Sequence, residues 1–183
     1  QVDIARATAI WYLGQFPTQQ SVDLLTKMTE EPNSLIRKSA ARAIRSLPQD
    51  QRKNVLTEML DDSVGAVRVA AAQGLTEFSV VDFVPGLKPR FKSALKEYRT
   101  YLDVNQYFPN GLMNRGQYFE NQGETEKAIK AYQKALEKDP QFNPARMNLA
   151  YLYNSQGNKS RARELFEKVI DQEPEYGPAY YSL

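Results

Sequence analysis

The C-terminal part of the chain repeats its own pattern with a fixed period of 34. Seven positions carry small, aromatic or helix-breaking residues in both copies: Gly116, Phe119, Gly123, Ala128, Tyr132, Ala135 and Pro140, then Ala150, Tyr153, Gly157, Ala162, Phe166, Val169 and Pro174. Small residues let two helices cross closely, aromatic rings fill the space between repeats, and a proline stops a helix. A unit of this size cannot bury its apolar face alone, so the pattern predicts stacked helix pairs.

This pattern resembles the tetratricopeptide family over residues 109–183, with two full repeats and the start of a third. The resemblance implies four helices, at about 111–121, 125–138, 144–155 and 160–172. It also places Arg115 where the family has a buried leucine, and we expect this arginine to face the helix that precedes the repeats.

In this family the first helix of each repeat lines a concave groove that binds peptides. The resemblance assigns that groove to the following positions: Asn110, Met113, Asn114, Gln117, Met147, Asn148, Tyr151, Asn154 and Tyr181. Family members that bind chaperones hold a terminal carboxylate there with lysine and arginine, which these positions lack. Methionine, tyrosine and amides instead favour an extended peptide, with adaptable apolar contacts and hydrogen bonds to its backbone.

The first half carries a different repeat, with a period of 31. Three segments align without gaps and predict helices with one small, apolar face at 5–16, 35–47 and 66–78. Shorter helices at 20–29 and 52–60 lie between them, and prolines fall in the connections. The segments resemble HEAT repeats over residues 3–80, in a compact form, because each second helix opens on an arginine and continues with alanines.

An arginine recurs at the same position in each of these helices, as Arg6, Arg37 and Arg68. Glu31 and Asp62 stand six positions before Arg37 and Arg68, and in HEAT proteins such acids and arginines form a ladder between repeats. We therefore predict a ladder. A second interpretation concerns only the middle repeat, where Lys38, Arg42 and Arg45 would form a basic patch that binds phosphate or nucleic acid.

The sequence predicts a helix at 89–105 that joins the two kinds of repeat. The chain is accordingly expected to have two regions, 1–105 and 106–183. The predicted fold is all-α, with about ten helices in a right-handed α-solenoid, or superhelix, of stacked antiparallel helix pairs. No Gly/Ser-rich stretch separates the regions, so we expect one continuous stack rather than two domains on a flexible linker.

Composition restricts the chemistry that the chain can perform. Its 183 residues include 24 Lys and Arg against 22 Asp and Glu, and neither Cys nor His occurs. Disulfides, thiolate or imidazole metal ligands and nucleophile–histidine pairs are thereby excluded. The sequence predicts a non-catalytic scaffold for protein–protein interactions, with no cofactor, no metal and a protein or peptide partner; nucleic acid and membrane insertion are not expected.

Two other functions stay open at the level of the sequence. HEAT repeats followed by tetratricopeptides are similar in arrangement to the C-terminal region of exported bacterial multihaem cytochrome c proteins, which implies a docking region with the haem groups upstream. Some HEAT-like proteins excise damaged bases, but that chemistry needs a carboxylate among aromatic residues in a basic cleft, and the sequence shows no such cluster.

The termini carry further expectations. No signal peptide or apolar run of about 18 residues is present, and we expect a soluble protein of the bacterial cytoplasm or periplasm, cut from a longer chain. Trp11 is expected to be exposed, and Tyr180 to pack toward the helix before it. Val169 and Leu183 at one end, and Ile10 and Trp11 at the other, would remain partly open and support weak self-association.

Overall fold

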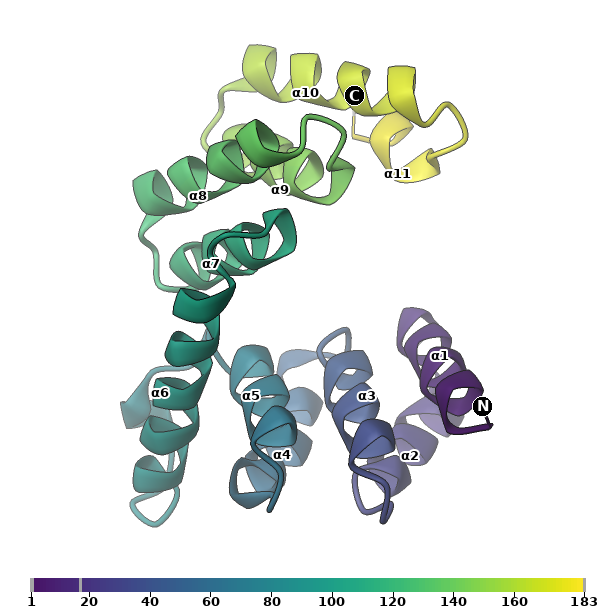
Figure 1. Cartoon of the computed structure of the whole chain (residues 1–183), viewed down its shortest axis with the longest axis vertical. Coiled ribbons are helices and arrows are strands. Elements are labelled where there is room, and N and C mark those ends of the chain that lie inside the picture. The colour runs from purple at the N-terminus through teal and green to yellow at the C-terminus, as the bar shows by residue number, and fades with distance from the viewer. Residues whose placement is uncertain (1, 17, 183) are drawn as a thin grey trace. The chain divides into compact units, whose positions relative to one another are not determined.

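The computed structural model describes residues 2–16 and 18–182, and every regular element in them is helical (Figure 1). The elements are α1 (Val2–Gln15), α2 (Gln19–Met28), α3 (Ser34–Ile44), α4 (Gln49–Glu58), α5 (Gly65–Gly74), α6 (Lys88–Asn105), α7 (Pro109–Asn121), α8 (Thr125–Lys138), α9 (Asn143–Ser155), α10 (Lys159–Gln172) and α11 (Gly177–Tyr180), with short 3-10 helices η1 (Met59–Asp61) and η2 (Val80–Asp82). The predicted all-α repeat fold is confirmed.

The chain forms two compact units, residues 1–101 and 102–183, and the boundary falls inside α6. The predicted boundary, between residues 105 and 106, lies slightly further along the chain. Each unit has its own buried core and is described by itself.

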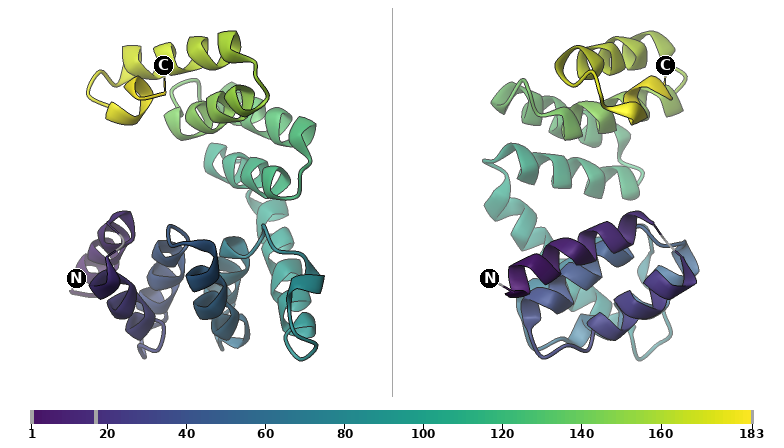
Figure 2. Two further views of the ribbon diagram at one scale, coloured as in Figure 1. Left: turned by 180° about the vertical axis from the view of Figure 1, so that it is seen from behind. Right: turned by 90° about the vertical axis from the view of Figure 1, so that its right-hand side faces the viewer.

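In the first unit, α1, α3 and α5 lie side by side in one layer, with α2 and α4 behind them (Figures 1 and 2). Fully buried aliphatic side chains fill the space between the layers: Ile10, Leu25, Ile36, Ile44, Leu56, Val67 and Leu75. Close approach of α1 and α3 depends on Gly14, because a Cβ there would lie 2.7 Å from the carbonyl oxygen of Ala43. The small residues of the N-terminal repeat thus set the distance between its helices.

Two of the predicted helices end earlier than the sequence pattern indicates. α3 ends at Ile44 and α5 at Gly74, whereas the predicted spans continued to Leu47 and Phe78. The chain continues there in tight turns, with the amide of Leu47 bonded to the carbonyl of Ile44, 3.0 Å away. Leu47 is nevertheless 3% exposed. An apolar residue that stays buried in a turn therefore gives the same sequence pattern as a further turn of helix.

The predicted arginine ladder is present, and each arginine pairs with an acid of the following helix pair. Arg37 binds both carboxylate oxygens of Asp62, at 2.6 and 2.9 Å. Arg6 binds Glu31 at 2.8 Å. Arg37 also donates to the main-chain carbonyl of Glu31, 2.8 Å away, so that acid contributes its backbone as well. The ladder consequently joins neighbouring repeats through side chains and fixes the turn within each repeat.

The middle pair of this ladder is the best shielded from water. The side chains of Arg37 and Asp62 are 13% and 9% exposed, against 42% and 32% for Arg6 and Glu31. The hydrogen bond from Arg37 holds the pKa of Asp62 below its ordinary value. The third pair joins Arg68 to Glu97 of α6 at 3.0 Å. Position 93, which the spacing of the other two pairs indicates, is a serine, and the acid lies one helical turn later.

The second unit stacks α7 and α8 against α9 and α10, with α11 against α10 (Figure 2). Each long pair turns at a glycine with positive φ, Gly123 at 72° and Gly157 at 78°. The following amide bonds back to the preceding helix, from Glu124 to the carbonyl of Phe119 at 2.8 Å. This is the Schellman arrangement that ends a helix at a left-handed glycine. In the next repeat, Pro144 stands in the first turn of α9, where a proline is well tolerated.

Aromatic side chains packed against small residues hold this unit together. A Cβ on Gly116 would lie 2.4 Å from the ring of Tyr132, which is fully buried and whose hydroxyl donates to Glu120 at 2.8 Å. One repeat later, Ala150 and Phe166 occupy the equivalent positions and are also buried.

The tetratricopeptide resemblance places Arg146 where the family usually has a tryptophan, and this arginine is buried. Arg146 is 6% exposed and donates to the side chain of Gln172 at 2.6 Å. It also donates to the amide oxygen of Asn143 and to the carbonyl of Pro140. Burial lowers the pKa of Arg146. The guanidinium group of Arg146 is therefore accommodated at the tryptophan position because three neutral oxygen atoms accept hydrogen bonds from it.

Candidate functional site

The predicted groove residues lie on α7, α9 and the segment that follows α11. Most of them are accessible to solvent. Tyr151 is 44% exposed and Tyr181 95% exposed, and Asn110 and Asn154 are also exposed. A second group is half-buried: Met113, Asn114, Gln117 and Asn148. We call the exposed and half-buried members of this set the groove face.

Met147 differs from the rest because it is 5% exposed and belongs to the core of the unit. Its side chain therefore presents almost no surface to a ligand. Met113, at the same position one repeat earlier, is only partly buried against that core. The two equivalent methionines therefore have different surroundings.

Tyrosines gather where α9 meets the last short helix. The hydroxyl of Ser182 donates to the hydroxyl of Tyr151 at 3.3 Å, and the ring of Tyr151 contacts Phe166 edge to face. Burial, together with nearby Tyr151 and Glu173, raises the pKa of Tyr176.

The predictions for the two termini are mixed. Trp11 is 54% exposed, as expected, whereas Ile10 is fully buried. Val169 is also fully buried, so the predicted opening at that position is wrong; it shares one core with residues of α8 and α9 and with Ala179 of α11. Tyr180 is 50% exposed, and Ala179 is the buried residue of α11. Leu183 lies outside the described residues, and self-association through these ends stays a prediction.

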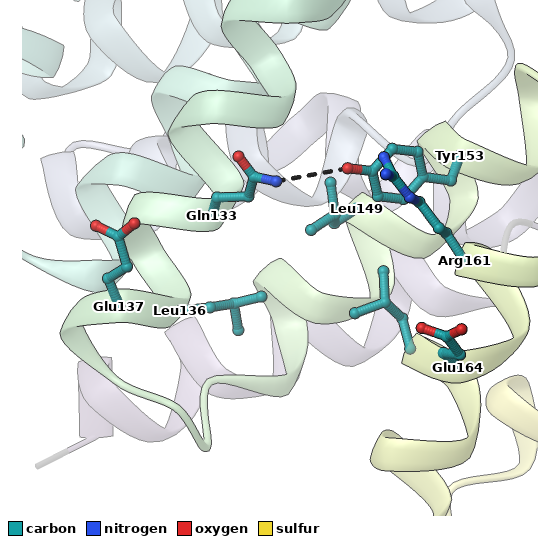
Figure 3. Close-up of a pocket in the computed structure, with 8 residues that line it drawn as sticks. Gln133, Leu136, Glu137, Leu149, Tyr153, Arg161 and Glu164 are labelled. Atoms are coloured by element: carbon teal, nitrogen blue, oxygen red, sulfur yellow. Dashed lines mark hydrogen bonds between the residues drawn. The ribbon is translucent and has the colours of Figure 1, made fainter. Parts of the chain in front are cut away.

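A cavity of about 680 Å³ lies between α8, α9 and α10, and none of the groove-face residues lines it (Figure 3). Its apolar lining comes from Leu136, Leu149 and Leu165. Polar side chains surround this floor, and Gln133 donates to the hydroxyl of Tyr153 at 3.5 Å. Arg161 lies over the Tyr153 ring, with 5.5 Å between the guanidinium carbon and the ring centroid. The cavity combines apolar contact with charges of both signs, since Glu137 and Glu164 also line it.

The sequence pattern did not predict this cavity. The family resemblance points to the first helix of each repeat, whereas most of the lining residues stand on α8 and α10, the second helices. A usable signal was present, because Tyr153 and Arg161 stand one repeat period after Phe119 and Lys127. In each repeat the ring is on the first helix and the cation on the second. A ring and a cation that recur in this way indicate a cation–ring contact across the space between the two helices.

Only two of the three residues of the predicted basic patch line the same pocket. Lys38 and Arg42 line a pocket of about 330 Å³ with residues of α5 and Tyr101. Arg45 points elsewhere, because its side-chain carbons lie against Gly74 and burial lowers its pKa. Two cations therefore share the pocket, and phosphate or nucleic-acid binding there stays a prediction.

Neither a metal site nor a membrane span is indicated by the described residues. Among them, no group of three or more Asp and Glu side chains is arranged to hold a metal ion. Within the same residues, no helix combines the length and apolar character that crossing a bilayer requires.

Comparisons with known proteins agree with the two kinds of repeat. A search of curated proteins finds no match. Among solved structures, the crystal structure of MamA aligns with a TM-score of 0.45 and 23% identity, over 80% of this chain and 74% of that one. A model of HEAT repeats matches residues 3–76, and two models of tetratricopeptide repeats match residues 90–141 and 121–183. The chain is therefore built of HEAT repeats followed by tetratricopeptide repeats.

Proposed function

We propose that the chain is a non-catalytic scaffold that binds an extended peptide segment of a partner protein on the groove face of its second unit. Tandem tetratricopeptide repeats support a role in protein interaction, and HEAT and tetratricopeptide families are typically non-catalytic. The single observation behind the choice of site is the set of accessible amides and tyrosines on α7, α9 and the last segment, led by Tyr181 at 95% exposed.

The chemistry of the groove face suits a peptide backbone. Each amide side chain both donates and accepts hydrogen bonds, so Gln117 and Asn154 can bond the N–H and C=O groups of an extended strand. The half-buried Met113 and the ring of Tyr151 supply adaptable apolar contact. None of these four residues is charged, which favours a peptide recognised by backbone and apolar side chains over one held by a terminal carboxylate.

The test is a selection of displayed random peptides on the intact chain, followed by affinity measurements with the enriched synthetic peptides. Gln117→Ala and Asn154→Ala are each expected to weaken binding by about three- to tenfold, the loss of one or two net hydrogen bonds. Gln133→Ala removes an equivalent amide from the cavity between α8 and α10, and serves as the matched control.

Two outcomes would contradict the proposal. Peptides that lose affinity with Gln133→Ala but not with Gln117→Ala or Asn154→Ala would move the site to the α8–α10 cavity. A selection that enriches no sequence, with a correctly folded chain by circular dichroism, would remove the support for peptide binding.

A further inference from the structure

The second unit contains a smaller pocket that is the one-repeat-earlier counterpart of the cavity in Figure 3. It has a volume of about 210 Å³. Its lining residues are Gln106, Leu112, Arg115, Phe119, Lys127, Lys130, Ala131 and Lys134. One repeat period after Arg115, Phe119 and Lys127 stand three residues of the α8–α10 cavity: Leu149, Tyr153 and Arg161. A pocket at this position is thus a general result of stacking the repeats. The side chains that line it differ from one repeat to the next.

The two equivalent pockets differ in charge. Four cations and no acid line the earlier pocket, which we call the basic pocket. In the later cavity, leucine replaces Arg115 and glutamate replaces Lys130, as Leu149 and Glu164. The net charge of the whole chain is +2, so the basic pocket is a local concentration of positive charge on a nearly balanced surface.

The cations in the basic pocket are incompletely neutralised. Arg115 pairs with Asp103 at 2.9 Å, and Lys127 pairs with Glu124. In the part of the chain that the structure describes, Lys130 and Lys134 form no ion pair, and both are exposed. Placing ammonium groups beside one another without acids between them costs free energy that a bound anion would recover.

A ring provides the apolar part of the pocket. The guanidinium carbon of Arg115 and the ammonium of Lys127 each lie 5.5 Å from the centroid of Phe119. Phe119 is itself partly buried against the core, which keeps its ring in place. The arginine at the family's leucine position is therefore well placed for binding: it faces α6, as expected, and its fork lies beside a fixed ring and two unpaired lysines.

We propose that the basic pocket binds a short acidic peptide segment of a protein partner. Lys127, Lys130 and Lys134 share one face of α8 and span about 10 Å, which corresponds to about three residues of extended chain. Carboxylates spaced along such a segment would meet the lysines. Arg115, whose Nη1 already pairs with Asp103, would bond one of them through its Nε and Nη2.

A peptide fits the observations better than a nucleic acid does. Backbone phosphates of nucleic acids are bound along a long basic track, whereas this positive charge is confined to one pocket between α7 and α8. Acidic Asp103, Glu124 and Glu126 flank the pocket residues in the sequence, so the positive charge is short and matches an acidic segment of a few residues.

The pocket is separate from the groove face. Arg115 is two positions from Met113 and from Gln117, and two positions correspond to about 200° around a helix. The two surfaces therefore lie on nearly opposite sides of α7 and can be tested independently. Gln117→Ala is expected to leave acidic-peptide binding unchanged.

The experiment measures fluorescence anisotropy of a labelled peptide of eight glutamates, with a peptide of eight glutamines as the uncharged comparison. Saturable binding of the acidic peptide is expected at low salt. Lys134→Glu alone should weaken it by about threefold, and Lys130→Glu with Lys134→Glu by about tenfold, since each removes one attraction and adds one repulsion. These side chains are exposed, so circular dichroism should show an unchanged fold.

The repeat supplies a matched control, because Lys168 stands on α10 at the position equivalent to Lys134 on α8. Lys168→Glu changes the net charge of the chain by the same amount and should leave the affinity within about 1.5-fold. Equal losses from Lys134→Glu and Lys168→Glu would show attraction to the chain's overall charge and overturn the proposal. Absence of saturable binding would also overturn it. Tighter binding of a single-stranded DNA 12-mer, with the same sensitivity to Lys130→Glu, would assign the pocket to nucleic acid instead.

Discussion

The two units hold their helices together with different interactions. In the HEAT unit a charged ladder crosses from repeat to repeat, with Arg37 and Asp62 at its centre. In the tetratricopeptide unit, aromatic rings such as Tyr132 and Phe166 are buried beside Gly116 and Ala150. From this difference we expect the stability of the first unit to depend on pH and salt, and that of the second mainly on side-chain volume.

Phe166→Ala should produce the largest loss of stability. Phe166 is 1% exposed, and removing a buried ring of this size costs about 3–5 kcal/mol. Hydrogen exchange followed by mass spectrometry should show faster exchange in α9 and α10, with little change in α3 and α5. Lys168→Ala, on the exposed face of α10, is the control and should change stability by less than about 0.5 kcal/mol. Equal acceleration in α3 and α5 would show that the two cores unfold together.

Asp62→Asn should give the next largest effect, in the first unit. Removing one partner of a shielded ion pair leaves Arg37 uncompensated and costs about 2–4 kcal/mol. The pKa of Asp62 is lowered in the folded state, so its contribution is complete above the ordinary carboxyl pKa and is lost as pH falls through the folded value. Thermal melts of both proteins from neutral to strongly acidic pH should therefore converge at the acidic end. A constant difference throughout would mean that the pair does not act through charge.

Glu31→Gln should have the smallest effect, although it breaks the same kind of pair. Arg6 and Glu31 are 42% and 32% exposed, and such pairs contribute about 0–1 kcal/mol. The backbone carbonyl of Glu31 still accepts from Arg37 in this variant, which preserves the turn. Melts at high salt should remove the remaining difference. A loss as large as that of Asp62→Asn would show that exposure does not set the strength of the ladder.

Much of the fold followed from regular spacing in the sequence. The tetratricopeptide resemblance implied α8 at its observed bounds, 125–138, and the HEAT resemblance turned the arginine column into the prediction of a ladder. The third ladder pair was beyond that reasoning, because Glu97 departs from the spacing of the other two pairs and only the path of α6 brings it to Arg68. Position in a repeat also did not reveal that Met147 is buried while Met113 is partly accessible.

The sites were predicted less completely than the fold. The groove residues were assigned from the family resemblance. That resemblance identifies binding positions on the first helix of each repeat and gives no information about pockets lined by the second helices. The basic pocket depends on Arg115 and on three lysines from another helix, Lys127, Lys130 and Lys134. None of the three lysines is distinctive in the sequence, because a lysine on a helix is usually only a solvent-exposed charge. What joins them is the packing distance between α7 and α8, which periodicity alone does not supply.

The buried Arg146 has a consequence for anyone who redesigns these repeats. Consensus engineering would restore tryptophan at this position, on the ground that the family uses it. An indole offers one N–H donor, whereas Arg146 serves Asn143, Gln172 and the carbonyl of Pro140 at the same time. The substitution would leave the amide oxygen of buried Asn143 without this donor and would also remove the bonds to Gln172 and Pro140. A redesigned repeat should therefore keep Arg146 together with the three residues that accept its hydrogen bonds, or replace all four positions together.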